Sequence, residues 1–162
     1  MVRQSTKRNK DSDVPKVITR PPVIYAFFLM LSFILQYVFY LYVARNFWVV
    51  NVGVAMMISG VVIMMIAIRQ FKAAGTSYEV SVPSKVLITD GLYQHSRNPI
   101  YVALTLVYLG IGFTLNNLWT VIFILPILMA VHVGVIFPEE EYLKKKFGRK
   151  YTNYFKQTRR WF

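Results

Sequence analysis

Two small clusters of polar and charged residues stand at the ends of two apolar runs. The first cluster contains Arg97, Asn98 and Tyr101, and the second contains Glu139 and Glu140. The runs are joined by a pair of consecutive asparagines, so they predict an antiparallel helical hairpin with both clusters at its open end. If this hairpin crosses a bilayer, charged groups at its mouth are costly and are usually retained for binding or chemistry. The sequence therefore predicts a site of mixed charge at one end of a helical bundle.

The arginine cluster continues along one face of its predicted helix. Arg97, Tyr101, Leu104 and Tyr108 recur at intervals of three and four residues, which is the spacing of a helical stripe. A guanidinium and a phenol at the end of this stripe have the chemistry to hold a carboxylate through charge-assisted hydrogen bonds. The alternative is an arginine that snorkels beside an interfacial tyrosine, which membrane helices show routinely.

Glu139, Glu140 and Glu141 form the densest group of acids in the chain. One interpretation is a helix N-terminus, where carboxylates interact favourably with the helix dipole and with the lysines that follow. The other interpretation is that one or two of these carboxylates face the mouth of the bundle and bind a cationic ligand.

The two histidines are further candidates. His132 lies inside the fourth apolar run, where an ionisable residue marks a functional site by default, although a neutral imidazole bonded to a neighbouring helix is commoner. His95 lies close to Arg97, either in the site or in solvent. The chain has no cysteine, no metal-spaced set of His and Asp and no glycine-rich nucleotide loop. We therefore predict no metal site and no Rossmann-type cofactor site.

Four apolar runs dominate this chain of 162 residues, of which 56% are hydrophobic. At about 1.5 Å per residue, helices of these lengths match the roughly 30 Å hydrocarbon core of a bilayer. A water-soluble bundle would need a polar stripe on each helix, and the second run has no charge and little polar face. We therefore predict an all-α integral membrane protein with four transmembrane helices and a cytoplasmic C-terminal helical segment. The predicted spans are residues 22–43, 49–68, 99–115 and 118–137.

The net charge of +12 is distributed very unevenly. Of the 19 lysines and arginines, all but Arg45 fall in segments that four successive spans place on one side of the membrane. The positive-inside rule then predicts an inner or plasma membrane protein with both termini in the cytoplasm. Such basic segments favour anionic lipid headgroups as partners and argue against nucleic acid. We predict a basic cytoplasmic tail over residues 1–20, disordered in solution, and a single membrane domain over residues 21–162.

The connections between the runs carry local signals. Residues 69–98 are punctuated by glycine and proline and predict a structured loop with a short extended piece. Asn98 is expected to cap the third span, with Pro99 at its first helical position. Pro126 predicts a kink in the fourth span, and Pro138 predicts the end or a bend of that span at the membrane surface.

Two further segments carry weaker predictions. The residues after Glu139 predict an amphipathic helix that is broken near Gly148. The second span is rich in small residues and methionine, including Gly53, Gly60 and Met64, which predicts close helix packing. The same residues offer a smooth and adaptable wall to a lipophilic molecule, and we expect bulk at Gly60 to interfere with such a ligand.

Two motifs resemble those of a known enzyme superfamily. The first is G-L-Y-Q-H-S-R-N-P-I-Y over residues 91–101, and the second is E-E-x-x-L-x-x-x-F-G-x-x-Y-x-x-Y beginning at Glu139. Together they resemble the isoprenylcysteine carboxyl methyltransferase and phospholipid methyltransferase superfamily over about residues 69–162. Residues 74–77 and the closing Arg-Arg-Trp are also similar to prokaryotic members. The carboxyl-methylating branch usually has Arg-His-Pro where this chain has Arg-Asn-Pro.

The resemblance implies an integral-membrane methyltransferase that binds S-adenosylmethionine without a Rossmann fold. It places the cofactor at the cytoplasmic ends of the last two spans, under the C-terminal segment. The residues that it implies for the cofactor site are Tyr93, His95, Arg97, Asn98, Pro99, Tyr101, Glu139 and Glu140. Of these, Arg97 and Glu140 are the predicted catalytic residues. S-adenosylmethionine carries a carboxylate, an ammonium and a sulfonium, and the predicted mouth of the hairpin offers partners of both signs.

The predicted reaction is methyl transfer to a lipophilic acceptor that enters between the helices. The sulfonium already activates the methyl group, so the protein mainly positions the substrates and excludes water. A carboxylate acceptor is favoured in a site of low dielectric constant because opposite charges cancel. An amine acceptor must instead lose a proton to a base such as a glutamate or His95. The alternative function is a non-catalytic lipid-binding or transport-associated membrane protein, although a transporter would usually show repeated halves.

Overall fold

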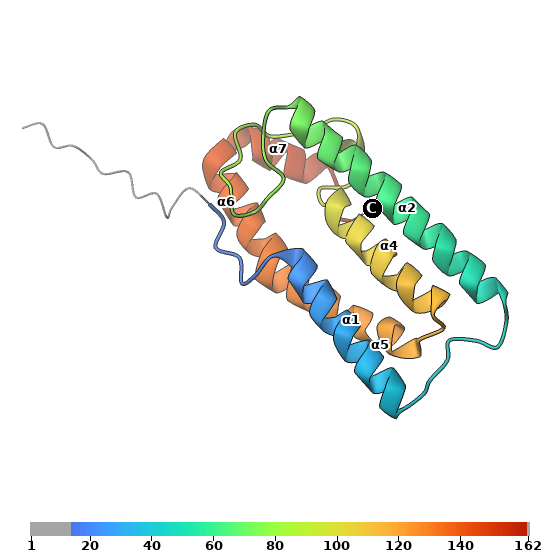
Figure 1. Cartoon of the computed structure of the whole chain (residues 1–162). Coiled ribbons are helices and arrows are strands. Elements are labelled where there is room, and N and C mark those ends of the chain that lie inside the picture. Colours follow the sequence, from blue (N-terminus) through green and yellow to red (C-terminus); the bar gives the residue numbers. More distant parts are fainter. Residues whose placement is uncertain (1–13, 162) are drawn as a thin grey trace, which may run out of the picture.

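The computed structural model describes residues 14–161, and the regular secondary structure in this part of the chain is entirely helical, without a β-strand (Figure 1). The all-α prediction is confirmed for these residues. The elements in chain order are α1 (Pro21–Val38), α2 (Trp48–Ala73), α3 (Leu92–His95), α4 (Pro99–Thr114), α5 (Leu118–Val131), the π-helical turn η2 (His132–Ile136), α6 (Phe137–Phe147) and α7 (Arg149–Gln157).

Three helices in the described part are long and apolar enough to cross a membrane. They are α1, α2 and the continuous helix Leu118–Phe147, which joins α5, η2 and α6. The predicted third span corresponds to α4, which has 16 residues and is therefore about 24 Å long. The structure thus supports three candidate spans, with α4 as a shorter apolar helix beside them.

The first predicted span is too long at its C-terminal end. Helix α1 ends at Val38, and the following residues form an irregular connection to α2. Asn116 holds this connection, because its Oδ1 accepts from the backbone N–H groups of Val43 (2.9 Å) and Ala44 (3.2 Å). The apolar residues after Val38 therefore belong to an irregular and largely exposed connection. Helix α2 in turn continues to Ala73, beyond the predicted end at residue 68.

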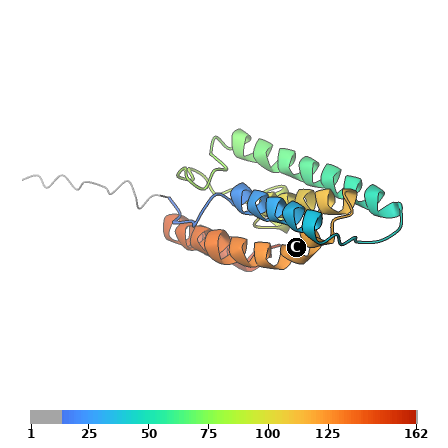
Figure 2. The same ribbon diagram turned by 60° about the horizontal axis from the view of Figure 1, so that its bottom comes forward.

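The four long helices lie side by side, with α4 packed along α2 and α1 packed against α5 (Figures 1 and 2). Glycines permit the close approach of α2 and α4. A Cβ atom added at Gly60 would lie only 2.8 Å from the carbonyl oxygen of Ala103, and one at Gly110 would lie 2.7 Å from that of Gly53. The expectation that Gly60 lines a wall for a ligand is therefore wrong, since this position is filled by α4.

Pro138 does not end the fourth helix, so of the two predicted outcomes, an end or a bend, the end is wrong. The helix continues through η2 and α6 to Phe147. Pro138 has no N–H to donate to the carbonyl of Gly134 one turn earlier, and the backbone N–H of Ile18 donates to that carbonyl instead (2.9 Å). The π-helical turn His132–Ile136 lies just before this proline. Such local departures from the α-helix are frequent at functional sites.

The hydrogen bond from the backbone N–H of Ile18 to the carbonyl of Gly134 holds residues 14–20 against the bundle. Val17 packs against the hydrophobic core, and Ile18 lies over Gly134. The expected disorder of the tail therefore does not extend to these residues, because their apolar side chains have a surface to cover. The remainder of the predicted tail, residues 1–13, lies outside the described residues.

The helix predicted after Glu139 breaks near Gly148, as expected. Helix α6 ends before this glycine, which has a φ of 54°, and α7 begins after it. Such a positive φ favours glycine. The long connection between α2 and α4 contains the short helix α3 and is otherwise irregular. It is fixed to α6 by a hydrogen bond from the backbone N–H of Ser84 to the hydroxyl of Tyr142 (3.2 Å).

Candidate functional site

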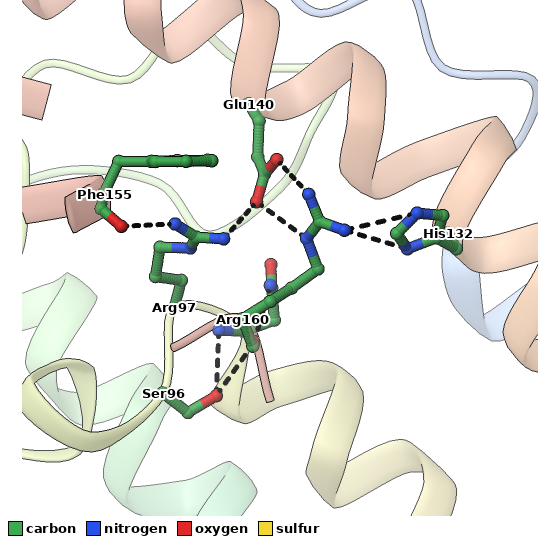
Figure 3. Close-up of polar contacts among 7 residues, drawn as sticks. Ser96, Arg97, His132, Glu140, Phe155 and Arg160 are labelled. Carbon is green, nitrogen blue, oxygen red and sulfur yellow. Dashed lines mark hydrogen bonds and ion pairs between the residues drawn. The ribbon is translucent and has the colours of Figure 1, made fainter. Parts of the chain in front are cut away.

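Glu140 lies between two arginines at one end of the bundle (Figure 3). Its Oε1 is 3.0 Å from Nη2 of Arg97 and accepts from Nε of Arg160 at 3.1 Å, and its Oε2 accepts from Nη2 of Arg160 at 2.8 Å. The side chains of Glu140 and Arg97 are only 6% and 7% exposed. Two guanidinium partners offset much of the cost of burying this carboxylate. The predicted convergence of Arg97 and Glu140 is confirmed.

The C-terminal segment after α7 folds back onto the first motif. The backbone N–H of Arg97 donates to the carbonyl of Arg159 (3.0 Å). Ser96 Oγ and Asn98 Nδ2 both donate to the carbonyl of Arg160 (3.2 and 3.0 Å). Asn98 therefore binds the C-terminal segment and makes no side-chain cap on α4, in contrast to the prediction. Pro99 does occupy the start of α4, as predicted.

His132 takes part in the same network. Nη1 of Arg160 lies 3.4 Å from Nδ1 and 3.2 Å from Nε2 of His132, which is in the π-helical turn (Figure 3). Its partner is thus the C-terminal segment and not a neighbouring helix. Sequence reasoning did not single out Arg160, because only the fold places it beside Glu140. The available signal was the closing Arg-Arg-Trp of the family resemblance.

Glu139 has a different environment from Glu140. Its Oε2 accepts from the hydroxyl of Tyr101 at 2.8 Å, which confirms the predicted proximity of these two residues. No arginine or lysine within the described range forms an ion pair with Glu139. The two neighbouring carboxylates therefore differ in charge compensation, since one has two cations and the other has a neutral phenol.

A pocket borders this network, and we refer to it as the charged pocket. It holds about 690 Å³ of space, part of it open to solvent. Its charged and polar lining includes Arg97, Asn98, Glu139 and Glu140, and its aromatic lining includes Phe71, Tyr93, Tyr142, Tyr151 and Tyr154. The Nε of Arg97 is buried here without a hydrogen-bond partner in the described part of the chain. A buried donor without a partner is costly, so this pocket suits a ligand with an acceptor group.

The tyrosines of the charged pocket that lie outside the long helices are neutral. Burial raises the pKa of Tyr93, and the nearby Glu139 carboxylate raises it further. Burial likewise raises the pKa of Tyr151 and Tyr154. The hydroxyl of Tyr154 donates to the carbonyl of Tyr93 (2.7 Å) and fixes α7 to α3. His95, by contrast, is exposed at the end of α3 and does not line this pocket.

A second pocket, which we call the apolar pocket, lies between the start of α1, α2 and α4. It holds about 1000 Å³ of space, part of it open. Its helical lining is Pro21, Pro22, Val23, Met64, Ile68, Ile100, Tyr101 and Leu104, and Arg20 and residues 78–81 complete it. Residues 78–80 line both pockets. The two pockets adjoin at Tyr101. This residue lines the apolar pocket, and its hydroxyl donates to Glu139 of the charged pocket.

Comparison with known proteins places the chain in a family. The family model described as phospholipid methyltransferase matches residues 48–150, which is more than half of the chain. The chain belongs to the phospholipid methyltransferase family. The matched range includes α2, α4, the charged pair Arg97–Glu140 and most of both pocket linings. The family resemblance deduced from the two motifs is therefore confirmed.

A curated relative supports the same family. The chain is 29% identical over 130 residues to protein-S-isoprenylcysteine O-methyltransferase B of Arabidopsis thaliana. This match covers 77% of the chain and 64% of the relative, so the chain spans just under two thirds of that protein's length. No solved structure matches the chain.

Proposed function

We propose that this member of the phospholipid methyltransferase family transfers a methyl group from S-adenosylmethionine to a lipophilic acceptor at the membrane boundary. The observation that carries this proposal is the contact between two pockets of opposite character. The charged pocket contains a guanidinium donor without a partner in the described part of the chain and three carboxylates, those of Glu79, Glu139 and Glu140, and the apolar pocket adjoins it between helices. A charged methyl donor and a lipophilic acceptor require these two environments side by side.

The residues of the charged pocket fit S-adenosylmethionine. When bound, the cofactor supplies an electrophilic methyl group on a sulfonium. Arg97 has a free buried Nε to bind a carboxylate, and Glu140 with Glu139 can bind an ammonium. Tyr93 and Tyr151 offer aromatic faces for an adenine ring. The C-terminal segment, bonded to Ser96 and Asn98, covers the network and excludes water from it.

The apolar pocket is proposed to hold the acceptor. Met64 and Ile68 of α2 line it together with Ile100 and Leu104 of α4, and the exposed outer faces of α1 and α2 are apolar. A molecule dissolved in the bilayer would reach this pocket between helices. The family is that of phospholipid methyltransferases and the Arabidopsis relative is a protein-S-isoprenylcysteine O-methyltransferase, and a phospholipid and an isoprenyl group both carry long apolar chains.

The membrane topology is part of the proposal. We propose that α4 spans the bilayer as a fourth, short helix, because it packs along α2 and joins directly to α5. All lysines and arginines except Arg45 then lie on one side, which places both termini in the cytoplasm. The exposed lysines of α6 and α7 would meet anionic headgroups on that side. Residues 21–162 would form a single methyltransferase domain.

Binding and transfer assays in nanodiscs test this function. We expect calorimetry to detect S-adenosylmethionine binding, and labelled methyl to enter phosphatidylethanolamine or N-acetyl-S-farnesylcysteine. Arg97→Ala and Glu140→Gln should weaken cofactor binding by about 30-fold or more, because each leaves a buried charge without one of its partners. Glu141→Gln is the matched control, since Glu141 is exposed on the same helix. Lipid binding without any cofactor binding would instead support a non-catalytic lipid-binding protein.

A further inference from the structure

The N-terminal segment that precedes α1 lines both pockets. Pro15 is buried in the lining of the charged pocket, and Arg20 belongs to the lining of the apolar pocket. We refer to residues 15–20 as the strap, because they run past the continuous helix of α5, η2 and α6 before α1 begins (Figure 1). The family model matches from residue 48 onwards, so the strap closes this end of the site from outside the matched range.

The strap is anchored where Pro138 leaves a carbonyl group free. The carbonyl of Gly134 accepts from the backbone N–H of Ile18 at 2.9 Å, in place of the N–H that proline lacks. Gly134 also has no side chain to keep the strap away. A Cβ atom added at Gly134 would meet Ile18 first, at 2.8 Å from its Cδ1, 3.3 Å from its Cγ1 and 3.5 Å from its Cβ. The contact between Ile18 and Gly134 therefore fixes the strap on the helix.

Few contacts hold the strap in place. In the part of the chain that the structure describes, its one hydrogen bond to the bundle is the bond to Gly134. Pro15 is buried, and Val17 packs against the hydrophobic core. Half of the six strap residues are exposed, namely Lys16, Ile18 and Arg20.

The C-terminal segment, which lies at the same end of the bundle, is held more firmly. Residues 96–98 donate three hydrogen bonds to the carbonyls of Arg159 and Arg160. The Arg160 side chain also binds Glu140. Segments with few buried contacts open locally at a lower cost in free energy than segments with many. Of these two segments, the strap is therefore the one that opens more readily.

We propose that the strap is the releasable cover of this site, and that the contact of Ile18 with Gly134 is its latch. This inference rests on the proposed function and concerns how S-adenosylmethionine and its thioether product enter and leave. Release of the strap removes Pro15 from the charged pocket and Arg20 from the apolar pocket, so one movement opens both. The rate of exchange then follows the opening of the strap.

A reversible disulfide tests the latch, because the native chain has no cysteine. The double variant Ile18→Cys/Gly134→Cys places two Cβ atoms 3.5 Å apart, within the range of about 3.5–4.5 Å that a disulfide needs. The exchange of labelled S-adenosylmethionine is measured in nanodiscs before and after oxidation. Oxidation should slow association and dissociation alike, by at least about tenfold.

The affinity and the single variants serve as controls for this experiment. The dissociation constant should stay within about threefold, because the disulfide holds the strap in the closed position that the structure shows. Dithiothreitol should restore the native rates. Neither Ile18→Cys nor Gly134→Cys alone should respond to oxidation, since each variant has a single cysteine.

A second set of variants loosens the latch without a disulfide. Gly134→Ala adds a Cβ atom against Ile18, so we expect both exchange rates to rise by at least about threefold. Hydrogen exchange at the Ile18 amide should also accelerate, and this measurement needs no cofactor. The double variant Ile18→Ala/Gly134→Ala removes the two nearest atoms of Ile18 and should return to native rates. Ile18→Ala alone should exchange as the native protein does, because this side chain is 80% exposed.

The outcomes separate this inference from the proposed function. Equal exchange rates in the oxidised and reduced double-cysteine protein would overturn the strap as a cover and leave the proposed function standing. Weaker binding after oxidation, with association unchanged, would assign the effect to distortion of the site and also overturn the inference. Native protein that binds no S-adenosylmethionine would overturn the proposed function and this inference with it.

Discussion

Single residues in this site are distinguished by their partners more than by their types. Glu139 and Glu140 are adjacent in sequence, yet Glu140 has two guanidinium partners and Glu139 has a phenol. Arg160 supplies a bidentate contact to Glu140 and is raised in pKa by that bond, so it remains charged. Because Arg160 binds Glu140 and does not line the apolar pocket, we expect it to position Glu140 without contacting the acceptor.

Replacement of Arg160 tests this positioning role. We expect Arg160→Ala to weaken S-adenosylmethionine binding by about 10- to 100-fold, because a charged hydrogen bond contributes about 1.5–3 kcal/mol. Arg160→Lys should recover part of the loss, since it keeps the charge but not the fork of two donors. Calorimetry in nanodiscs measures both, with Arg159→Ala as the control for an exposed neighbouring arginine. Equal affinity in Arg160→Ala and native protein would contradict the role.

At the scale of secondary-structure elements, small residues decide where helices touch and where they leave space. Gly53 and Gly60 bring α2 against α4, and Met64, one turn beyond Gly60, lines the apolar pocket. The apolar pocket therefore begins where the glycine contacts end. Positions on α2 that are one residue apart should consequently respond very differently to added bulk.

Bulk at Gly60 should disrupt the helix pair. Gly60→Phe forces a side chain into the backbone of α4 near Ala103, so we expect loss of folded protein, seen as a lower thermal midpoint in detergent. Val61→Phe is the matched control, because Val61 is 46% exposed on the outer face of α2. Similar midpoints for both variants would show that α2 and α4 do not pack as described.

Bulk at Met64 should instead affect the acceptor. Met64→Trp fills part of the apolar pocket, and we expect a KM for a lipid acceptor raised roughly tenfold with unchanged affinity for S-adenosylmethionine. Met65→Trp serves as the control, since Met65 is 49% exposed away from the pocket. Steady-state kinetics with added acceptor distinguishes the two. An unchanged KM in Met64→Trp would remove the apolar pocket as the acceptor site.

For the whole molecule, the arrangement brings the N-terminal segment, the long connection before α4 and the C-terminal segment to the same end of the bundle (Figure 1). Both pockets are at that end. Four spans would place this end on the basic side of the membrane. Chemistry on a charged cofactor and a membrane-dissolved acceptor would then occur at the cytoplasmic boundary.

Thiol labelling tests this orientation directly, because the native chain has no cysteine. We expect a membrane-impermeant maleimide to label Asn46→Cys in intact cells, since this residue lies in the connection between α1 and α2. Lys145→Cys on α6 should react only after permeabilisation. The reverse pattern of labelling would invert the topology and place the site outside the cytoplasm.

The sequence by itself determined the helical class, the hairpin and the closeness of the cluster of Arg97, Asn98 and Tyr101 to the cluster of Glu139 and Glu140. These follow from apolar periodicity and a short asparagine turn, which leave two antiparallel helices few alternative arrangements. Asn98 and Gly60 were assigned wrong local roles, and Pro138 does not end its helix, because each depends on a partner distant in the chain: Arg160, α4 and Ile18 respectively. Only the tertiary structure placed Arg160 on Glu140 and the Tyr101 hydroxyl on Glu139, since side-chain pairing across a fold is decided by packing and not by spacing along the chain.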